Sequence, residues 1–148
     1  MPKLFIEKLC DTPTPMYQTD YAVGMDIHAV IPEGSSAGHI SPGMTNIIQT
    51  GLKIQPSEGY GVFLYPRSGL AAKLNINLTN CVGVIDRDYK DELRVLLHNA
   101  GNDHVIIRDG ERICQMEVRA VDQAEVIVVD ELPSIDSNRT GGFGSTGT

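Results

Sequence analysis

One segment of the chain pairs an apolar run with residues that could carry out acid–base chemistry. Gly83-Val84-Ile85 leads directly into Asp86-Arg87-Asp88-Tyr89. A carboxylate at the end of a buried strand can be held rigidly and partly desolvated, as a general base requires. Asp-Arg-Asp is also common in the turns of β-hairpins. Taken alone, the segment fits a catalytic aspartate and a structural turn equally well.

Two further segments carry groups that could contact phosphate. Pro66-Arg67-Ser68-Gly69-Leu70 follows a predicted strand and opens the only predicted helix, residues 68–73. It combines a fork-shaped cation, a hydroxyl and a close backbone approach with the free N–H groups of a helix start. In Gly110-Glu111-Arg112-Ile113-Cys114-Gln115, the Gln115 amide could donate to a phosphate or a water. A capped helix and a solvent-facing strand residue are the simpler interpretations of these segments when each is taken singly.

The remaining two segments are an aspartate near the N-terminus and the tail. Asp26 enters a predicted strand two residues after Gly24, where it could organise metal-bound water or serve a turn. The tail contains Arg139-Thr140-Gly141-Gly142-Phe143-Gly144-Ser145-Thr146-Gly147. Its glycines would let backbone amides line a phosphate chain, and Phe143 offers a stacking face for a base. Composition alone favours a disordered terminus for the tail.

Strands must position most of these residues, because apolar and polar residues alternate in several places. The clearest alternations are Leu74/Ile76/Leu78, Leu93/Val95/Leu97 and Cys114/Met116/Val118. Shorter candidate strands are Leu4–Leu9, Ile27–Ile31, Gly61–Tyr65, His104–Ile107 and Glu125–Val129. The apolar run Val126–Val129 within the last of them is typical of a buried strand. Frequent turn signals between short strands predict an all-β sandwich or jelly roll with one short helix.

Composition limits the class of protein. The 148 residues and 41% apolar content suit one globular domain, predicted over 1–132, followed by an arm over 133–148. The net charge of −7 argues against nucleic-acid binding but not against a nucleotide. No apolar run is long enough for a membrane span, and no signal peptide is evident, so we expect a cytoplasmic protein. The three cysteines lack metal-ligand spacing and are expected to be small core residues.

Taken together and in this order, the five segments resemble the five motifs of the trimeric dUTPase family, over residues 22–147. The resemblance implies a β jelly roll that forms a homotrimer, with each active site built by three subunits. It implies Mg²⁺-dependent hydrolysis of dUTP to dUMP and pyrophosphate, which limits uracil in DNA and supplies dUMP for dTMP synthesis. The location would be the cytoplasm, or the host cytoplasm for a phage or viral protein.

The resemblance also assigns roles to residues. Asp86 would be the base for the water that attacks the α-phosphorus, and Asp26 would act through metal-bound water. The residues at the base and sugar would be Asn80, Gly83, Val84, Ile85 and Tyr89, with Tyr89 excluding a ribose 2′-OH. The residues at the phosphates would be Arg67, Ser68, Gly69 and Gln115, with Arg94 as a further contact. The arm, from another subunit, would supply Arg139, Phe143, Gly144, Ser145 and Thr146.

Two positions depart from the family pattern, and two alternative functions stay open. Asp91, after Lys90, replaces a glycine, which a turn with positive φ would favour, and Cys114 replaces a small alanine. Neither change removes a proposed catalytic group. The alternatives are a dCTP deaminase of the same fold and a nucleotide-gated regulator. A regulatory protein partner in addition to catalysis also stays open.

Overall fold

The computed structural model describes residues 1–136, and residues 137–148 lie outside the described part. Eleven strands and one short helix occupy the described part, which confirms the expectation of an all-β fold with one helix. The elements are β1 (Leu4–Lys8), β2 (Met25–His28), β3 (His39–Ile40), β4 (Thr45–Gln49), β5 (Leu52–Pro56), β6 (Tyr60–Pro66), α1 (Ser68–Leu74), β7 (Ile76–Leu78), β8 (Gly83–Ile85), β9 (Arg94–Asn99), β10 (Val105–Ile106) and β11 (Arg112–Ala120). The sequence patterns did not predict β3, β4 and β5.

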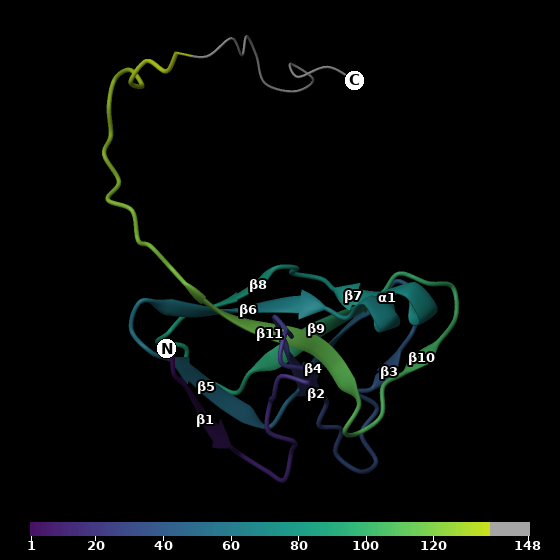
Figure 1. Ribbon diagram of the computed structural model, residues 1–148. Coiled ribbons are helices and arrows are strands. Elements are labelled where there is room, and N and C mark those ends of the chain that lie inside the picture. Colours follow the sequence, from purple (N-terminus) through teal and green to yellow (C-terminus); the bar gives the residue numbers. More distant parts are fainter. Residues whose placement is uncertain (137–148) are drawn as a thin grey trace.

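Two larger sheets enclose the core (Figure 1). One has the strand order β2-β11-β6-β8 and the other β4-β9-β7, while β1 pairs with β5 and β3 with β10. The inner faces of both larger sheets contribute to one apolar cluster, for example Met116 and Leu64 from the first and Val95 and Leu97 from the second. The predicted alternation in residues 93–97 is therefore confirmed, because Leu93, Val95 and Leu97 are all buried.

The helix corrects one predicted strand. Leu74 is the last residue of α1 and is 40% exposed, although the alternation with Ile76 and Leu78 had placed it in a strand. Asn75 ends the helix in the left-handed region, with φ of 53°, and its N–H donates back to carbonyl groups of the helix. Asparagine tolerates this conformation better than most residues. The change of direction at Asn75 delays the start of β7 until Ile76.

The segment after β11 corrects another prediction. No strand lies within residues 121–136, and the predicted buried strand at 125–129 is instead exposed, with Val126 at 87% and Val128 at 92%. Figure 1 shows this stretch running away from the sheets after Ala120. Within residues 1–136, the apolar run is therefore left uncovered. The chain leaves the sheets well before residue 132, and the domain boundary at that position stays a prediction.

The single helix within residues 1–136 falls short of the length and apolar character that a membrane-spanning helix needs.

Candidate functional site

Sheet register brings three of the five segments to one end of β6. Asp26 on β2 lies opposite Gln115 on β11, and Gln115 in turn lies opposite Tyr65 on β6. Arg67 follows directly after β6 and takes the position before the first residue of α1, Ser68. A Cβ on Gly24 would lie 3.2 Å from the Cβ of Gln115, so the glycine allows β2 and β11 to approach closely here.

Asp26 is the centre of an ion-pair cluster. It is 3% exposed, and its Oδ1 and Oδ2 lie 3.1 Å from Arg67 Nε and from Arg112 Nη1 respectively. The Arg112 contact is also an aligned hydrogen bond, while the Arg67 contact is ionic without that alignment. Arg67 Nη1 additionally donates to the Arg112 carbonyl oxygen at 3.0 Å. One carboxylate thus orders two guanidinium groups and leaves a net positive charge.

Arg112 is a site residue that the sequence patterns missed. Its signal was present, because a basic residue opens the strand that carries Gln115. What the patterns could not give is the register shift between Arg112 and Cys114, which places Arg112 opposite His28. A β-bulge of this kind re-aims a side chain at a strand end.

A pocket of about 670 Å³ extends from this cluster and has a cationic lining. Arg67, Arg108 and Arg112 line it together with His28 and His104, and Glu111 pairs with Arg108 at 3.6 Å. Burial lowers the pKa of His28; the Asp26 carboxylate opposes the shift, and Arg112 and Arg67 add to it. The pocket is therefore suited to an anion, although the whole chain carries a net charge of −7.

The cysteines fulfil the expectation only in part. Cys114 is fully buried beside Asp26, and burial, reinforced by that carboxylate, raises the pKa of its thiol to about 12. It is therefore a protonated core side chain at neutral pH. Cys10 and Cys81 were wrongly expected in the core, because they lie in loops outside the strands and are exposed. All three are free thiols.

The segment that ends in Asp86 forms the short strand β8, which lies close against β6. β8 pairs with β6, with Leu64 opposite Gly83 and Val62 opposite Ile85. A Cβ on Gly83 would lie 3.1 Å from the Cβ of Leu64 and 3.6 Å from Nδ2 of Asn80, so this glycine keeps backbone groups close to the Asn80 amide. Such an arrangement offers donors and acceptors to a planar base.

The environment of Asp86 differs from the expected one. β8 is only partly buried, with Val84 62% exposed, and Asp86 itself is exposed in the single chain. A turn follows, in which Tyr89 N–H donates to the Asp86 carbonyl oxygen at 3.2 Å. The part of the chain described by the structure thus does not itself provide the desolvation that a general base requires.

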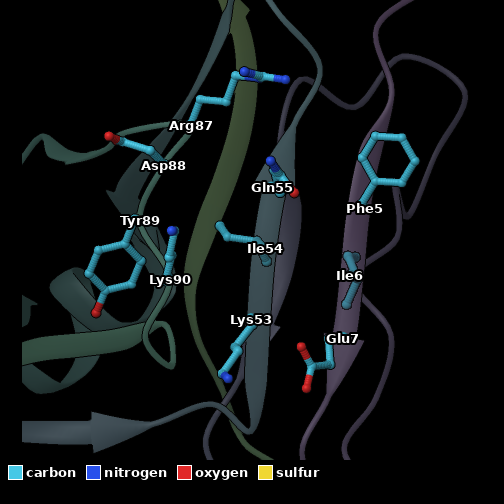
Figure 2. A pocket seen from close by; sticks show the side chains of 10 residues that line it. All are labelled: Phe5, Ile6, Glu7, Lys53, Ile54, Gln55, Arg87, Asp88, Tyr89 and Lys90. Atoms are coloured by element: carbon cyan, nitrogen blue, oxygen red, sulfur yellow. The ribbon is translucent and has the colours of Figure 1, made fainter.

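Residues 87–90, which follow Asp86, line a different pocket. Tyr89 is half-buried, and its hydroxyl donates to the Glu92 carbonyl oxygen at 3.0 Å. Residues 87–90 line a pocket of about 430 Å³ together with residues of β5 and β1. Figure 2 shows residues 87–90 on one side of β5 and β1 on the other. Asp91 does not adopt positive φ, because Asn75 is the one non-glycine residue within 1–136 that does. The turn therefore does not require the family's glycine.

One chain keeps Asp86 apart from the cationic cluster. Ile85 lies opposite Val62, so Asp86 adjoins the beginning of β6, where it lines a pocket of about 730 Å³ with Tyr60 and Val121. Arg67 lies beyond the other end of β6, and the five residue steps from Val62 to Arg67 correspond to roughly 17 Å of extended chain. Each chain therefore presents two half-sites.

The other predicted contacts have the following positions. Arg94 opens β9 in the second sheet, opposite Gln49 of β4, and is exposed. Gly69 lies in the first turn of α1 with open space around it. The arm residues lie outside the described part of the chain, and they are Arg139, Phe143, Gly144, Ser145 and Thr146.

Comparison with known proteins decides the family. The dUTPase family model matches residues 11–147. The chain belongs to the dUTPase family. A deoxyuridine 5′-triphosphate nucleotidohydrolase of Nautilia profundicola is 43% identical over 98% of this chain and 99% of the relative. One of Bartonella bacilliformis is 40% identical over 90% of this chain and 81% of the relative.

Solved dUTPase structures share the fold. A mutant dUTPase of Staphylococcus bacteriophage 80alpha with dUpNHpp superposes with a TM-score of 0.83 at 21% identity, over 99% of both chains. A mutant dUTPase from phage phi11 of S. aureus, described for its coordination of a structural Mg(II) ion, gives 0.76 at 19% identity over 89% of this chain and 99% of that one. The family and enzyme class expected from the five segments are confirmed.

Proposed function

We propose that this protein hydrolyses dUTP to dUMP and pyrophosphate. The observation that carries the proposal is the pair of half-sites that a dUTPase-family chain presents at the two ends of β6. One is a hairpin with backbone polar groups, the Asn80 amide and the Asp86 carboxylate. The other is the cationic cluster of Arg67 and Arg112 around Asp26, next to Gln115.

The hairpin half-site would select the nucleoside. Asn80 and the backbone groups of Gly83, Val84 and Ile85 would pair with the edge of uracil, and Tyr89 would pack under deoxyribose. A site built of hydrogen-bonding groups rejects the wrong pattern strongly, because its own groups would be left unpaired. This is the property needed to exclude dCTP, and it favours hydrolysis of dUTP over deamination of dCTP.

The cationic half-site would hold the triphosphate while Asp86 activates water. The Asp86 carboxylate would accept a proton from a water whose oxygen attacks the α-phosphorus. The bond from the α-phosphorus to the bridging oxygen would break, and pyrophosphate would leave with that oxygen. Arg67, Ser68, Gly69 and Gln115 would bind the phosphate oxygens and stabilise the charge that develops on them.

The chain's own residues fit a metal that arrives with the substrate. No cluster of three or more His, Cys, Asp or Glu side chains suited to a metal occurs within 1–136, so the phosphates would supply most Mg²⁺ ligands. Asp26 faces guanidinium groups with both oxygens, so any contribution from it would pass through a shared water. When bound, Mg²⁺ would neutralise charge on the departing pyrophosphate.

A jelly-roll homotrimer with shared sites would unite the half-sites. The separation of Asp86 from Arg67 along β6 supports a site to which two chains contribute. The exposed apolar run Val126–Val129 supports an arm that packs on a neighbouring chain. Contact with a neighbour would also bury Asp86, which one chain leaves exposed. The arm residues would then reach the site from a third chain, and the cytoplasmic location stays a prediction.

The deciding experiment measures pyrophosphate release from dUTP and, separately, from the four usual deoxynucleoside triphosphates, with Mg²⁺ and with EDTA. We expect release from dUTP alone, and its loss in EDTA because the phosphate charge is no longer neutralised. Ammonia release from dCTP would instead establish a deaminase. Equal release from all five nucleotides would contradict the base-reading role of the hairpin.

Deleting residues 138–148 tests the arm. We expect the truncated protein to keep its assembly while kcat for dUTP falls at least about tenfold, because closure of an arm excludes water and fixes the substrate. The measurement is steady-state pyrophosphate release, with the mass in solution determined by light scattering as the control. Full activity of an intact assembly would show that the arm does not act on the site.

A further inference from the structure

Glu92 connects the hairpin half-site to the turn between β4 and β5. Its carbonyl oxygen accepts from the Tyr89 hydroxyl at 3.0 Å. Its carboxylate Oε1 accepts from the Gly51 N–H at 2.8 Å. Glu92 therefore accepts a side-chain hydrogen bond from the loop with its carbonyl oxygen and a main-chain hydrogen bond from the β4–β5 turn with its carboxylate. A hydrogen bond to a carboxylate is stronger than one between neutral groups.

The turn that receives Glu92 is constrained at Gly51. Gly51 is buried with φ of 68°, and a Cβ on it would lie 2.5 Å from Cys10 Sγ, so a side chain at this position would be strained and would displace Cys10. Its carbonyl oxygen accepts from Leu9 N–H at 2.8 Å. The buried Gly51 N–H needs a partner, because an unpaired buried donor is costly. The Glu92 carboxylate is that partner.

The residue after Glu92 is fixed as firmly. Leu93 N–H donates to the Leu52 carbonyl oxygen at 2.7 Å, and the Leu93 carbonyl oxygen accepts from the hydroxyl of Thr50 at 2.6 Å. Thr50 and Leu93 are both fully buried. The Glu92 carbonyl oxygen that accepts the Tyr89 hydrogen bond is thus part of a segment whose residues Glu92 and Leu93 are both hydrogen-bonded to the β4–β5 turn region.

We propose that Glu92 is a positioning residue that holds Tyr89 in place and thereby sets discrimination between deoxyribose and ribose. The inference rests on the proposed function, in which Tyr89 packs under the sugar. The Tyr89 hydroxyl closes a short loop over Lys90 and Asp91, so the ring cannot move without breaking this bond. A fixed ring leaves no room for a 2′-OH. The same closure holds the loop together at Asp91, where the family usually has glycine.

The test compares kcat/KM for dUTP with kcat/KM for UTP in matched variants. Glu92→Ala removes the acceptor of Gly51, Glu92→Gln keeps an oxygen there, and Tyr89→Phe removes the hydroxyl. The control is Asp109→Ala, which removes another carboxylate that accepts a backbone N–H at 2.8 Å, that of Ile31. We expect the dUTP-to-UTP ratio to fall about tenfold in the alanine and phenylalanine variants, the scale of one lost hydrogen bond. In Glu92→Gln and Asp109→Ala it should change by no more than about twofold.

Two further readouts separate positioning from general destabilisation. The double variant Glu92→Ala/Tyr89→Phe should discriminate no worse than Tyr89→Phe, because both changes break one connection. Amide exchange at Gly51 should accelerate in Glu92→Ala but not in Tyr89→Phe. An unchanged ratio in Glu92→Ala with accelerated exchange would overturn the proposal. So would additive losses in the double variant.

The proposed function can fail without removing this test. If the wild-type protein releases no pyrophosphate from dUTP, the dissociation constants of dUMP and UMP replace the kinetic ratio in the same variants. If Glu92→Ala does not fold, Glu92→Asp replaces it, because the shorter side chain withdraws the carboxylate from the Gly51 N–H. An unchanged dUTP-to-UTP ratio in Glu92→Asp, with accelerated amide exchange at Gly51, would then reject Glu92 as the positioning residue.

Discussion

Replacing Asp86 by asparagine should reduce kcat for dUTP by about 10² to 10⁴, the contribution of a positioned general base. Asparagine has nearly the same shape but cannot accept the proton of the attacking water at neutral pH. The hairpin turn should persist, because it is held by backbone contacts between Tyr89 and Asp86 and between β8 and β6. The affinity for a non-hydrolysable dUTP analogue should therefore change little.

The measurement is single-turnover pyrophosphate release, with analogue binding by calorimetry on the same preparation. Asp88→Asn is the matched control, since Asp88 lies in the same turn, is exposed and has no proposed role in proton transfer. Equal losses in both variants would indicate that the charge of the turn matters rather than a base at residue 86. Normal turnover of Asp86→Asn would exclude it as the base.

Mixing two inactive variants should restore activity if the sites are shared. Asp86→Asn lacks the proposed base and Arg67→Ala lacks a proposed phosphate-binding cation, so each variant on its own should be nearly inactive. If the protein forms the proposed homotrimer, roughly a quarter of the sites in trimers refolded from an equal mixture should combine an intact Asp86 from one chain with an intact Arg67 from another, by the symmetry of a closed ring. Activity should return to about that fraction of wild type.

The control for this experiment is a mixture of wild-type chains with the double variant Asp86→Asn/Arg67→Ala. Shared sites should again give roughly a quarter of wild-type activity, whereas sites within one chain should give about half. The two arrangements thus differ in both mixtures. No recovery in the first mixture together with half activity in the second would show that Asp86 and Arg67 of the same chain build one site. That result would conflict with the separation seen along β6.

The sequence predicted the fold class and which motif residues lie together better than it predicted the burial and contacts of those residues. Alternation found β9 and β11 because one face of each strand is buried. It failed for β5, where two apolar residues, Leu52 and Ile54, are followed by Pro56, and for residues 125–129, where it reported apolar side chains but not what covers them. Periodicity measures hydrophobicity, and only the tertiary or quaternary context tells whether a strand is completed within one chain.

The site shows the same limits. The motifs identified Arg67, Gln115 and Asp26 but did not reveal Arg112, because its contact with Asp26 depends on a bulge between Arg112 and Cys114. They raised a conflict at Asp91 that disappears in the structure, since the backbone there does not need positive φ. Nor could spacing along the chain show that Asp86 and Arg67 lie at opposite ends of β6.

The uncovered run Val126–Val129 has a consequence for how the protein behaves on dilution. If neighbouring chains cover these apolar side chains, folding and association are coupled, and the population of intact assemblies follows mass action. Specific activity would then fall at low protein concentration even when every chain is chemically intact. Specific activity would therefore rise with protein concentration. Unassembled chains would expose an apolar stretch that is prone to aggregate.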